Sequence, residues 1–184
     1  MDIAQHAPDT VIFAEDEASL CLQATTIAVW ASRGQTPVVR AAPNRDKTCF
    51  YGSLDLLNGR EIVAQAPTMN AQTSAHYLQQ ILDAIPHRPL LLFWDHAPWH
   101  RGQAIREVLS ANPRLEIMYF PVAAPDQNPQ ESVWKATRRA ISHNHCTRRL
   151  PELANRFKQH LTTHTFASSF LDRYGFNPIC PMFT

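Results

Sequence analysis

The apolar positions in the first half of the chain follow patterns that are typical of β-strands. Residues 10–16 are almost wholly apolar until acids close the run, which predicts a strand buried on both faces. Two further runs, 48–57 and 60–66, flank Asn58-Gly59. Asn-Gly between two such runs favours a tight type I′ hairpin turn, because both turn residues must take positive φ. The amino-terminal part is therefore expected to be an antiparallel meander.

After Pro67 the pattern alternates between helical spacing and short apolar runs. The segments with helical spacing lie at 72–85 and 102–111, and the apolar runs lie at 90–95 and 115–120. Alternation of strands and helices implies a parallel sheet with right-handed crossovers. The sequence therefore predicts an α/β fold with a mixed sheet, antiparallel in its first part and parallel in its second, and flanked by helices on both faces.

Two more helices are predicted in the last third of the chain. The first opens at Asn128, a good N-cap, with Pro129 at the first helical position, and is expected to run to about Ser142. The second covers roughly 151–163. Because no internal repeat or low-complexity linker divides the sequence, residues 1–184 are expected to form a single domain with a real core.

Three acids stand out against these elements. Asp16 ends the first apolar strand and Asp95 ends the strand at 90–95, although aspartate is a poor strand residue. Glu131 lies one turn into the predicted helix that opens at Asn128. Neighbouring parallel strands lie about 4.8 Å apart, so carboxylates at their matched ends can share a cation, and a helical Glu can close the site. Oxygen ligands of this kind favour Mg²⁺ or Mn²⁺ over zinc.

Two of the three acids also have an interpretation that needs no metal. Glu131 is placed to bond back to the helix cap in a capping box, and Asp16 is placed to cap the next turn. Only the joint occurrence of the three acids in this topology favours a carboxylate cluster. Two ions about 3.5–4 Å apart would activate the attacking oxygen and stabilise the leaving oxygen of an in-line phosphoryl displacement.

Basic residues concentrate towards the C-terminus, although the net charge of the chain is only +1. Between Ser132 and His160 the sole acid is Glu152. The basic residues in this stretch are Lys135, Arg138, Arg139, Arg148, Arg149, Arg156 and Lys158. A basic flank suits a nuclease, because phosphates must be drawn towards carboxylates that repel them. A solvated helical face would give the same composition.

The cysteines, the histidine-rich segment and the hydropathy give no competing assignment. The four cysteines are far apart and are expected to be free thiols in a reducing compartment: Cys21, Cys49, Cys146 and Cys180. Residues 143–146 (His-Asn-His-Cys) are not expected to bind metal, because adjacent side chains point in different directions. No signal peptide and no apolar span of membrane length is present, so we expect a cytoplasmic protein without membrane contact.

Four ordered motifs resemble those of the IS630/Tc1/mariner transposases, with IS630-type members the most similar. Residues 11–17 (Val-Ile-Phe-Ala-Glu-Asp-Glu) resemble the first acidic motif, and residues 30–39 resemble the segment that follows it. Residues 90–100 are similar to the motif of the second Asp. Residues 125–134 are similar to the Asn-Pro-x-Glu-x-x-Trp motif that carries the third acid. The similarity covers roughly residues 10–165, which is most of the chain.

The resemblance implies an RNase H-like catalytic domain of a DDE transposase, which cleaves and transfers DNA strands. Asp16, Asp95 and Glu131 would be its catalytic, metal-binding triad, with two Mg²⁺ or Mn²⁺ ions. The implied partners are transposon-end and target DNA, bound by a homodimer associated with the nucleoid. Two residues depart from the family pattern, His96 in place of a common Asn and Gln130 in place of an often aliphatic residue. The N-terminal helix-turn-helix domain of relatives is expected to be absent from this chain.

Other residues receive secondary assignments. Four basic residues are candidates for contacts with DNA phosphates, although each also fits a solvent-facing charge: Arg101, Lys135, Arg138 and Arg139. His100 is expected to satisfy a backbone carbonyl in preference to a phosphate, and Trp134 to pack in the core. Glu15 and Glu17 are expected on the face of the strand opposite Asp16, outside the metal site.

Two other functions remain open at the level of sequence. A host nuclease of the same fold would hydrolyse DNA without strand transfer. A catalytically silent DNA-binding remnant of a mobile element would do neither, although intact acids at all three positions argue against decay.

Overall fold

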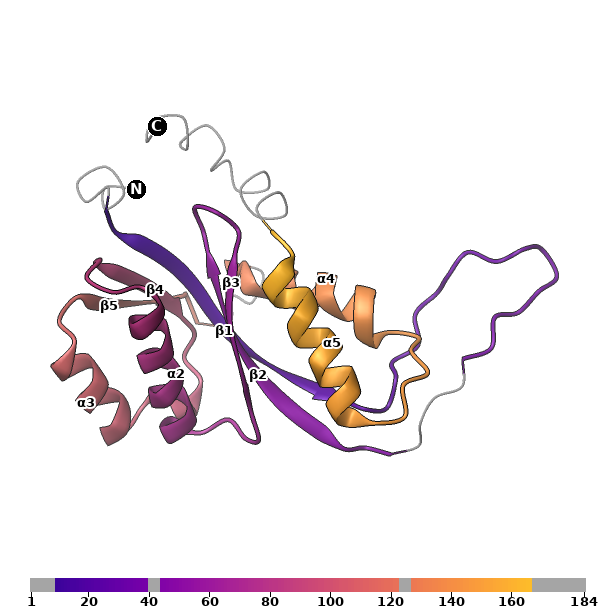
Figure 1. The fold of residues 1–184 in the computed structure, drawn as a ribbon, viewed down its shortest axis with the longest axis horizontal. Helices are drawn as coiled ribbons and strands as arrows, with labels where there is room; N and C mark the ends of the chain where they lie inside the picture. Colours follow the sequence, from indigo (N-terminus) through magenta and orange to yellow (C-terminus); the bar gives the residue numbers. More distant parts are fainter. Residues whose placement is uncertain (1–8, 40–43, 123–126, 167–184) are drawn as a thin grey trace.

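A computed structural model describes residues 9–39, 44–122 and 127–166. Its centre is a five-stranded sheet with the order β3-β2-β1-β4-β5 (Figure 1). The strands are β1 (Val11–Cys21), β2 (Lys47–Asp55), β3 (Glu61–Ala66), β4 (Leu90–Trp94) and β5 (Leu115–Tyr119). β1, β2 and β3 pair antiparallel, whereas β4 pairs parallel with both β1 and β5. The predicted mixed sheet is confirmed.

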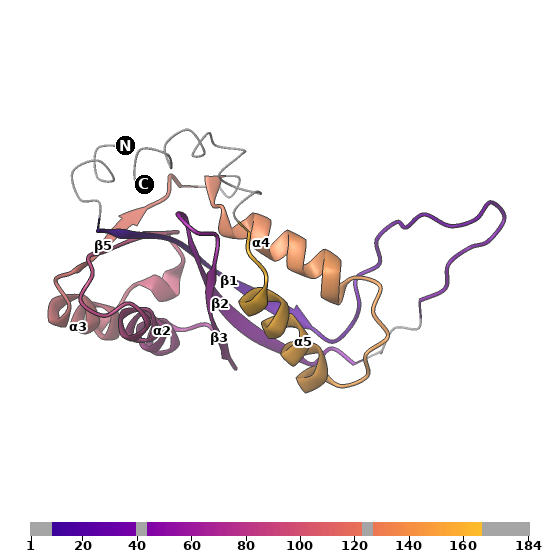
Figure 2. The same ribbon diagram turned by 45° about the horizontal axis from the view of Figure 1, so that its top comes forward.

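Helices cover both faces of this sheet (Figure 2). The helices are α2 (Ala71–Ala84), α3 (Gln103–Ala111), α4 (Gln130–Thr137) and α5 (Leu150–Thr163), with the 3-10 turn η1 (Pro98–His100) after β4. One apolar core packs α2 and α3 against the sheet, with Leu78 and Ile105 in it. A second core packs α4 and α5, with Trp134 and Phe157 in it. The two layers of helices therefore place separate sets of side chains against the two faces of β1.

α4 is shorter than the predicted helix, which was expected to continue to about Ser142. It gives way to a π-helical turn, η3 (Arg138–Ser142). Asn128 does act at the start of α4, because its side-chain oxygen accepts a hydrogen bond from the Gln130 backbone N–H at 3.1 Å. π-Helical turns inside helices occur frequently at functional sites.

β1 is longer than predicted, and the expected strand end at Asp16 is wrong. The antiparallel partner β2 stays paired with β1 as far as Cys21, so the ladder continues past Asp16. The parallel partner β4 stops pairing at the Ala14–Phe93 pair. Asp16 therefore lies just beyond the carboxyl end of the parallel half. Continuing that register by two residues sets Asp16 level with Asp95.

The β2–β3 hairpin forms as predicted, but its turn is not type I′. Residues 56–60 connect the strands, and of the two central residues only Gly59 has a positive φ, at 70°. The carboxylate of Asp55 accepts hydrogen bonds from the backbone N–H groups of Leu57 and Asn58, at 2.9 and 3.3 Å. An acid at the strand end therefore organises a wider loop in which a single residue needs the left-handed conformation.

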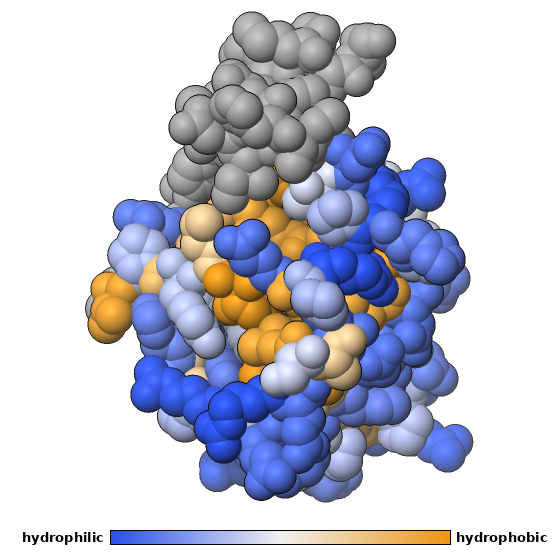
Figure 3. Space-filling view, turned by 90° about the vertical axis from the view of Figure 1, so that its left-hand side faces the viewer, coloured by the Kyte–Doolittle hydropathy of each residue, from blue (hydrophilic) through white to orange (hydrophobic). Residues whose placement is uncertain are grey.

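Two surface features complete the fold. The residues that follow β1, up to residue 39, project from the sheet as a long arm (Figure 1), and Trp30 in this arm is fully exposed. β5 is an edge strand from which Met118 and Tyr119 reach the surface. Figure 3, which views the molecule from the side of β5 and α3, shows an apolar area rimmed by polar side chains. No helix in the described part of the chain is long and apolar enough to cross a membrane.

Candidate metal-binding site

Asp16 lies on the face of β1 that α4 covers. Its Oδ2 accepts a hydrogen bond from the indole Nε1 of Trp134 at 3.1 Å. Trp134 is buried in the core as predicted, and it also fixes the orientation of this carboxylate. Burial raises the pKa of Asp16 to about 7, and the negative charges of Glu131, Glu17 and Asp95 add to the effect. The site therefore carries surplus negative charge around Asp16.

Asp95 follows directly after β4, and its partners hold it in place. Its Oδ1 accepts a hydrogen bond from the Ala97 backbone N–H at 2.9 Å and lies 2.9 Å from Nδ1 of His100. Burial raises the pKa of Asp95, but the hydrogen bonds from His100 and Ala97 outweigh burial and leave the pKa below its ordinary value. With 45% of its side chain exposed, the carboxylate stays ionised and open to a ligand.

Glu131 lies in the first turn of α4 and is half-buried. Asn128 pins the start of this helix to β1, because its side-chain amide donates to the Glu15 carbonyl oxygen at 3.3 Å. Among the described residues the Glu131 side chain makes no hydrogen bond back to the Asn128 backbone N–H, so the capping box does not form, although the Asn128 side chain does accept from Gln130. The Glu131 carboxylate therefore remains available to a ligand.

The structure brings the three acids to one region without bringing them to coordination distance. Among the described residues, the one group of three metal-binding side chains whose ligand atoms all lie within 4.8 Å of one another is a different one. Asp16 and Asp95 are held by separate partners, Trp134 and His100. The donor set nevertheless suits a divalent cation, because all the donors are oxygens. Burial and, after it, the neighbouring acids raise the pKa of Asp16, and a bound cation would counter both effects.

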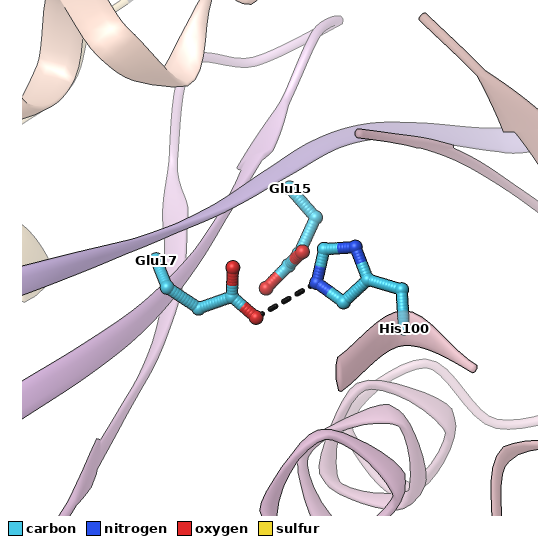
Figure 4. Close-up of side chains that lie close together, drawn as sticks. All are labelled: Glu15, Glu17 and His100. Carbon is cyan, nitrogen blue, oxygen red and sulfur yellow. Dashed lines mark hydrogen bonds and ion pairs between the residues drawn. The ribbon is translucent and has the colours of Figure 1, made fainter. Parts of the chain in front are cut away.

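Sequence reasoning missed a buried network on the other face of β1. Figure 4 shows Glu15, Glu17 and His100 converging there. The Glu17 carboxylate accepts from Trp99 Nε1 and pairs with His100 Nε2, each at 2.9 Å. The other ring nitrogen of His100 lies 3.1 Å from the Asp95 backbone oxygen, which confirms the expected carbonyl contact. His100 thus bridges Glu17 and Asp95.

The electrostatics of His100 follow from this bridge. Burial alone would lower the pKa of His100, but hydrogen bonds to Asp95 and Glu17 outweigh burial and raise the pKa to about 9. Its ring stacks on Trp94 with centroids 3.9 Å apart. His100 is only 2% exposed, so it supports Asp95 from behind and does not reach a phosphate.

The positions of Glu15 and Glu17 on the face of β1 opposite Asp16 were predictable from the sequence. Their partner, His100, was not. Period-two alternation put Glu15 and Glu17 on one face, and the structure confirms that they face away from Asp16. Two acids on one buried face of a strand require a cationic or protonated partner. His100, five residues after Asp95, was the signal in the sequence that answers this requirement.

Gly52 allows α4 to lie close to the sheet next to Asp16. It pairs with Asp16 across the β1–β2 ladder. A Cβ on Gly52 would lie 2.5 Å from Nε2 of Gln130 and 2.6 Å from Cη2 of Trp134. Glycine is therefore needed here to let α4 approach the sheet closely.

Replacing Gly52 with alanine is expected to lower the free energy of unfolding by about 1–3 kcal/mol, because the added methyl group overpacks a buried contact. Urea unfolding followed by circular dichroism measures the change. In a Gln130→Ala/Trp134→Phe background the atoms nearest to the added methyl group are gone, so the same substitution should cost clearly less. An equal cost in both backgrounds would contradict the contact.

Three of the four predicted DNA-binding residues lie together. Lys135, Arg138 and Arg139 line a surface pocket of about 420 Å³ that Ile27 and His143 also line. Arg101 is exposed, but it lies on a different element, directly after η1. The three clustered residues extend along α4 and η3, starting one turn after Glu131.

Comparison with known proteins identifies the family. The family model described as DDE superfamily endonuclease matches residues 10–154. The curated relative "Insertion element IS630 uncharacterized 39 kDa protein" of Shigella sonnei is 26% identical over 156 residues, which cover 83% of this chain and 45% of the relative.

Solved structures show the fold. The catalytic domain of Mos1 mariner transposase matches with a TM-score of 0.61 and 14% identity, covering 94% of this chain and 78% of that one. The Mos1 transposase paired-end complex with the left transposon end matches with a TM-score of 0.64 and 16% identity, covering 94% and 53%. The expected RNase H-like fold is thereby confirmed, and the chain spans about half the length of the IS630 relative and of the transposase in that complex. The chain belongs to the DDE superfamily of endonucleases.

Proposed function

We propose that this chain is the catalytic domain of a DDE transposase, which cleaves DNA and transfers the cut strand in a metal-dependent reaction. The observation that supports the proposal most is the proximity of Asp16, Asp95 and Glu131, which come from three separate parts of the fold. Beyond the carboxyl end of the parallel β1–β4 pairing, the charges of Glu131 and Asp95 add to the effect of burial in raising the pKa of Asp16. Ligands of open α/β sheets collect at this end. The family match supports the endonuclease chemistry.

The side chains of the site have distinct roles in this proposal. Asp16, Asp95 and Glu131 would hold two Mg²⁺ or Mn²⁺ ions. When bound, the ions activate the attacking oxygen and stabilise the leaving oxygen of the phosphodiester. Trp134 orients Asp16 through its indole N–H. His100 and the Ala97 backbone N–H orient Asp95 and keep it ionised.

The ion type follows from the donors and is supported by the relatives. Carboxylate oxygens without a soft ligand select Mg²⁺ or Mn²⁺. Mos1 paired-end complexes have been solved with Mg and with Mn. We therefore expect either ion to support the reaction.

The partner in this proposal is DNA, in the form of transposon ends and target. Transposition joins two ends to one target, so we propose that the chain acts as a homodimer on DNA, in the cytoplasm and associated with the nucleoid. Mos1 complexes with transposon ends support the choice of partner. Arg101, Lys135, Arg138 and Arg139 are proposed to contact its phosphates.

The test is nicking of a supercoiled plasmid together with joining of a labelled duplex that carries a free 3′-hydroxyl. Nicking and joining are both expected in Mg²⁺ or Mn²⁺, and neither in EDTA. Nicking without joining would favour the host nuclease. DNA binding without nicking or joining, in either metal, would favour the silent remnant and overturn the proposal.

The basic cluster on α4 and η3 yields a separate prediction. Replacing both Lys135 and Arg139 with glutamine is expected to weaken DNA binding about equally for all sequences, because contacts with phosphates carry no sequence information. The slope of log affinity against log salt should fall by about 1 for each phosphate that the double variant no longer neutralises.

Fluorescence anisotropy with duplex DNA at several salt concentrations measures this slope. Arg106→Gln is the matched control, because Arg106 is an exposed arginine on α3, on the other face of the sheet. An equal loss of affinity in the control, or an unchanged slope in the double variant, would contradict the assignment.

A further inference from the structure

A second cluster of metal-binding side chains lies behind the proposed catalytic site. Glu15, Glu17 and His100 each offer a ligand atom, and these atoms all lie within 4.8 Å of one another. Figure 4 shows the two carboxylates, from β1, and the imidazole, from η1, converging. Glu15 is 0% exposed, and the side chains of Glu17 and His100 are 2% and 0% exposed. The cluster faces away from Asp16.

The carboxylate of Glu15 is buried in this cluster without a partner that balances its charge. Neither of its carboxylate oxygens has a hydrogen-bond partner among the described residues. The indole N–H of Trp94, which likewise has no partner among the described residues, is near enough to Glu15 to offset part of its charge but makes no hydrogen bond of ordinary geometry to it. An unpaired carboxylate buried in this way is costly unless a cation or a proton balances it.

His100 cannot balance the charge of Glu15, because it already pairs with two other acids. His100 already contacts the Glu17 carboxylate through one ring nitrogen and Asp95 through the other. One imidazolium would therefore serve three acids. A divalent cation would balance Glu15 and Glu17 together, because the ligand atoms of both carboxylates lie within 4.8 Å of each other and of the imidazole.

We propose that Glu15, Glu17 and Nε2 of His100 form a second metal site, which holds one transition-metal ion such as Mn²⁺. This inference goes beyond the proposed catalytic function. Two carboxylates and an imidazole suit Mn²⁺ or Zn²⁺ better than Mg²⁺, which the oxygen-only donors on the other face prefer.

The geometry around His100 fits this role. Ligand atoms about 2.1 Å from one ion lie roughly 3–4.3 Å apart, so a small closure of the observed cluster suffices. A metal-binding histidine commonly donates its second ring N–H to a carboxylate or a carbonyl, which fixes the tautomer. Nδ1 of His100 has both partners in Asp95, at 2.9 and 3.1 Å. The ion would thus support Asp95 through the imidazole ring.

The test is pulsed electron paramagnetic resonance of the full chain, stripped with EDTA and then loaded with Mn²⁺. One Mn²⁺ per chain should show coupling to a histidine nitrogen, because the carboxylates of the other site supply only oxygens. The coupling should persist in an Asp16→Asn/Glu131→Gln variant, in which the proposed catalytic site is weakened. It should also persist in His96→Asn, which removes the exposed histidine next to Asp95.

Glu15→Gln should abolish the nitrogen coupling. Glu61→Gln should retain it and is the matched control, because Glu61 is also a buried acid with an unpaired oxygen but lies on β3. Oxygen-only coupling in the wild type, or coupling that Glu15→Gln leaves intact or His96→Asn removes, would overturn the site. The wild-type spectrum decides the question if Glu15→Gln does not fold. Plasmid nicking by the same preparation reports on the catalytic proposal separately.

Discussion

Asp95→Asn is expected to reduce nicking of supercoiled DNA in Mg²⁺ by at least about 1,000-fold. The melting temperature should fall somewhat, because the variant loses the ion pair with His100, but the chain should stay folded. Asparagine keeps the size of the side chain and can still accept the Ala97 N–H bond. It removes the carboxylate that His100 keeps ionised, and with it the negative charge that binds a divalent cation. Initial rates of nicking on an agarose gel give the ratio, and a thermal melt verifies folding.

Asp83→Asn is the matched control for this substitution, because Asp83 is an exposed acid in α2. Its nicking rate should equal that of the wild type. An Asp95→Asn variant that folds and keeps more than about a tenth of the wild-type rate would exclude Asp95 from the proposed triad.

Asp16→Asn is expected to change activity and stability in opposite directions. Nicking should be abolished, for the same reason as with Asp95. In EDTA at pH 8, however, the free energy of unfolding should rise by roughly 1–3 kcal/mol, because the substitution removes a charge that burial and three neighbouring acids disfavour. Trp134 can still donate to the asparagine oxygen. Opposite effects of this kind mark residues kept for function at the expense of stability.

The sign of the pH dependence follows from the raised pKa of Asp16. Its pKa is about 7 in the folded chain, against an ordinary value of 3.8. Between these values the unfolded chain ionises this group more readily, so the penalty on folding grows as pH rises from about 4 to about 7 and is constant above. The gain from Asp16→Asn should therefore be small at pH 4 and full at pH 8. Urea unfolding at both pH values measures it, and an equal gain at both would contradict the electrostatic cause.

The sequence was sufficient for most of the fold, because strand and helix periodicities are local signals. Its errors came where a distant partner decided the outcome. β1 continues past Asp16 because β2 keeps pairing with it as far as Cys21. The hairpin loop widened because Asp55 binds the backbone N–H groups of Leu57 and Asn58.

The proposed triad could also be predicted, because each acid stands out locally in its own element. Its supports could not be, since they join parts of the chain that lie far apart in sequence. Trp134 donates to Asp16 across 118 positions, and His100 meets Glu17 across 83. Periodicity placed Trp134 in the core correctly but gave no information on where its indole N–H would point.

The most direct test of the central claim is anomalous diffraction from crystals of the chain soaked in Mn²⁺. Metal density in contact with carboxylate oxygens of Asp16, Asp95 and Glu131 together is the result that the proposed function predicts. If saturating Mn²⁺ gives no density among these three side chains, or density that one of them never contacts, the proposed triad is wrong.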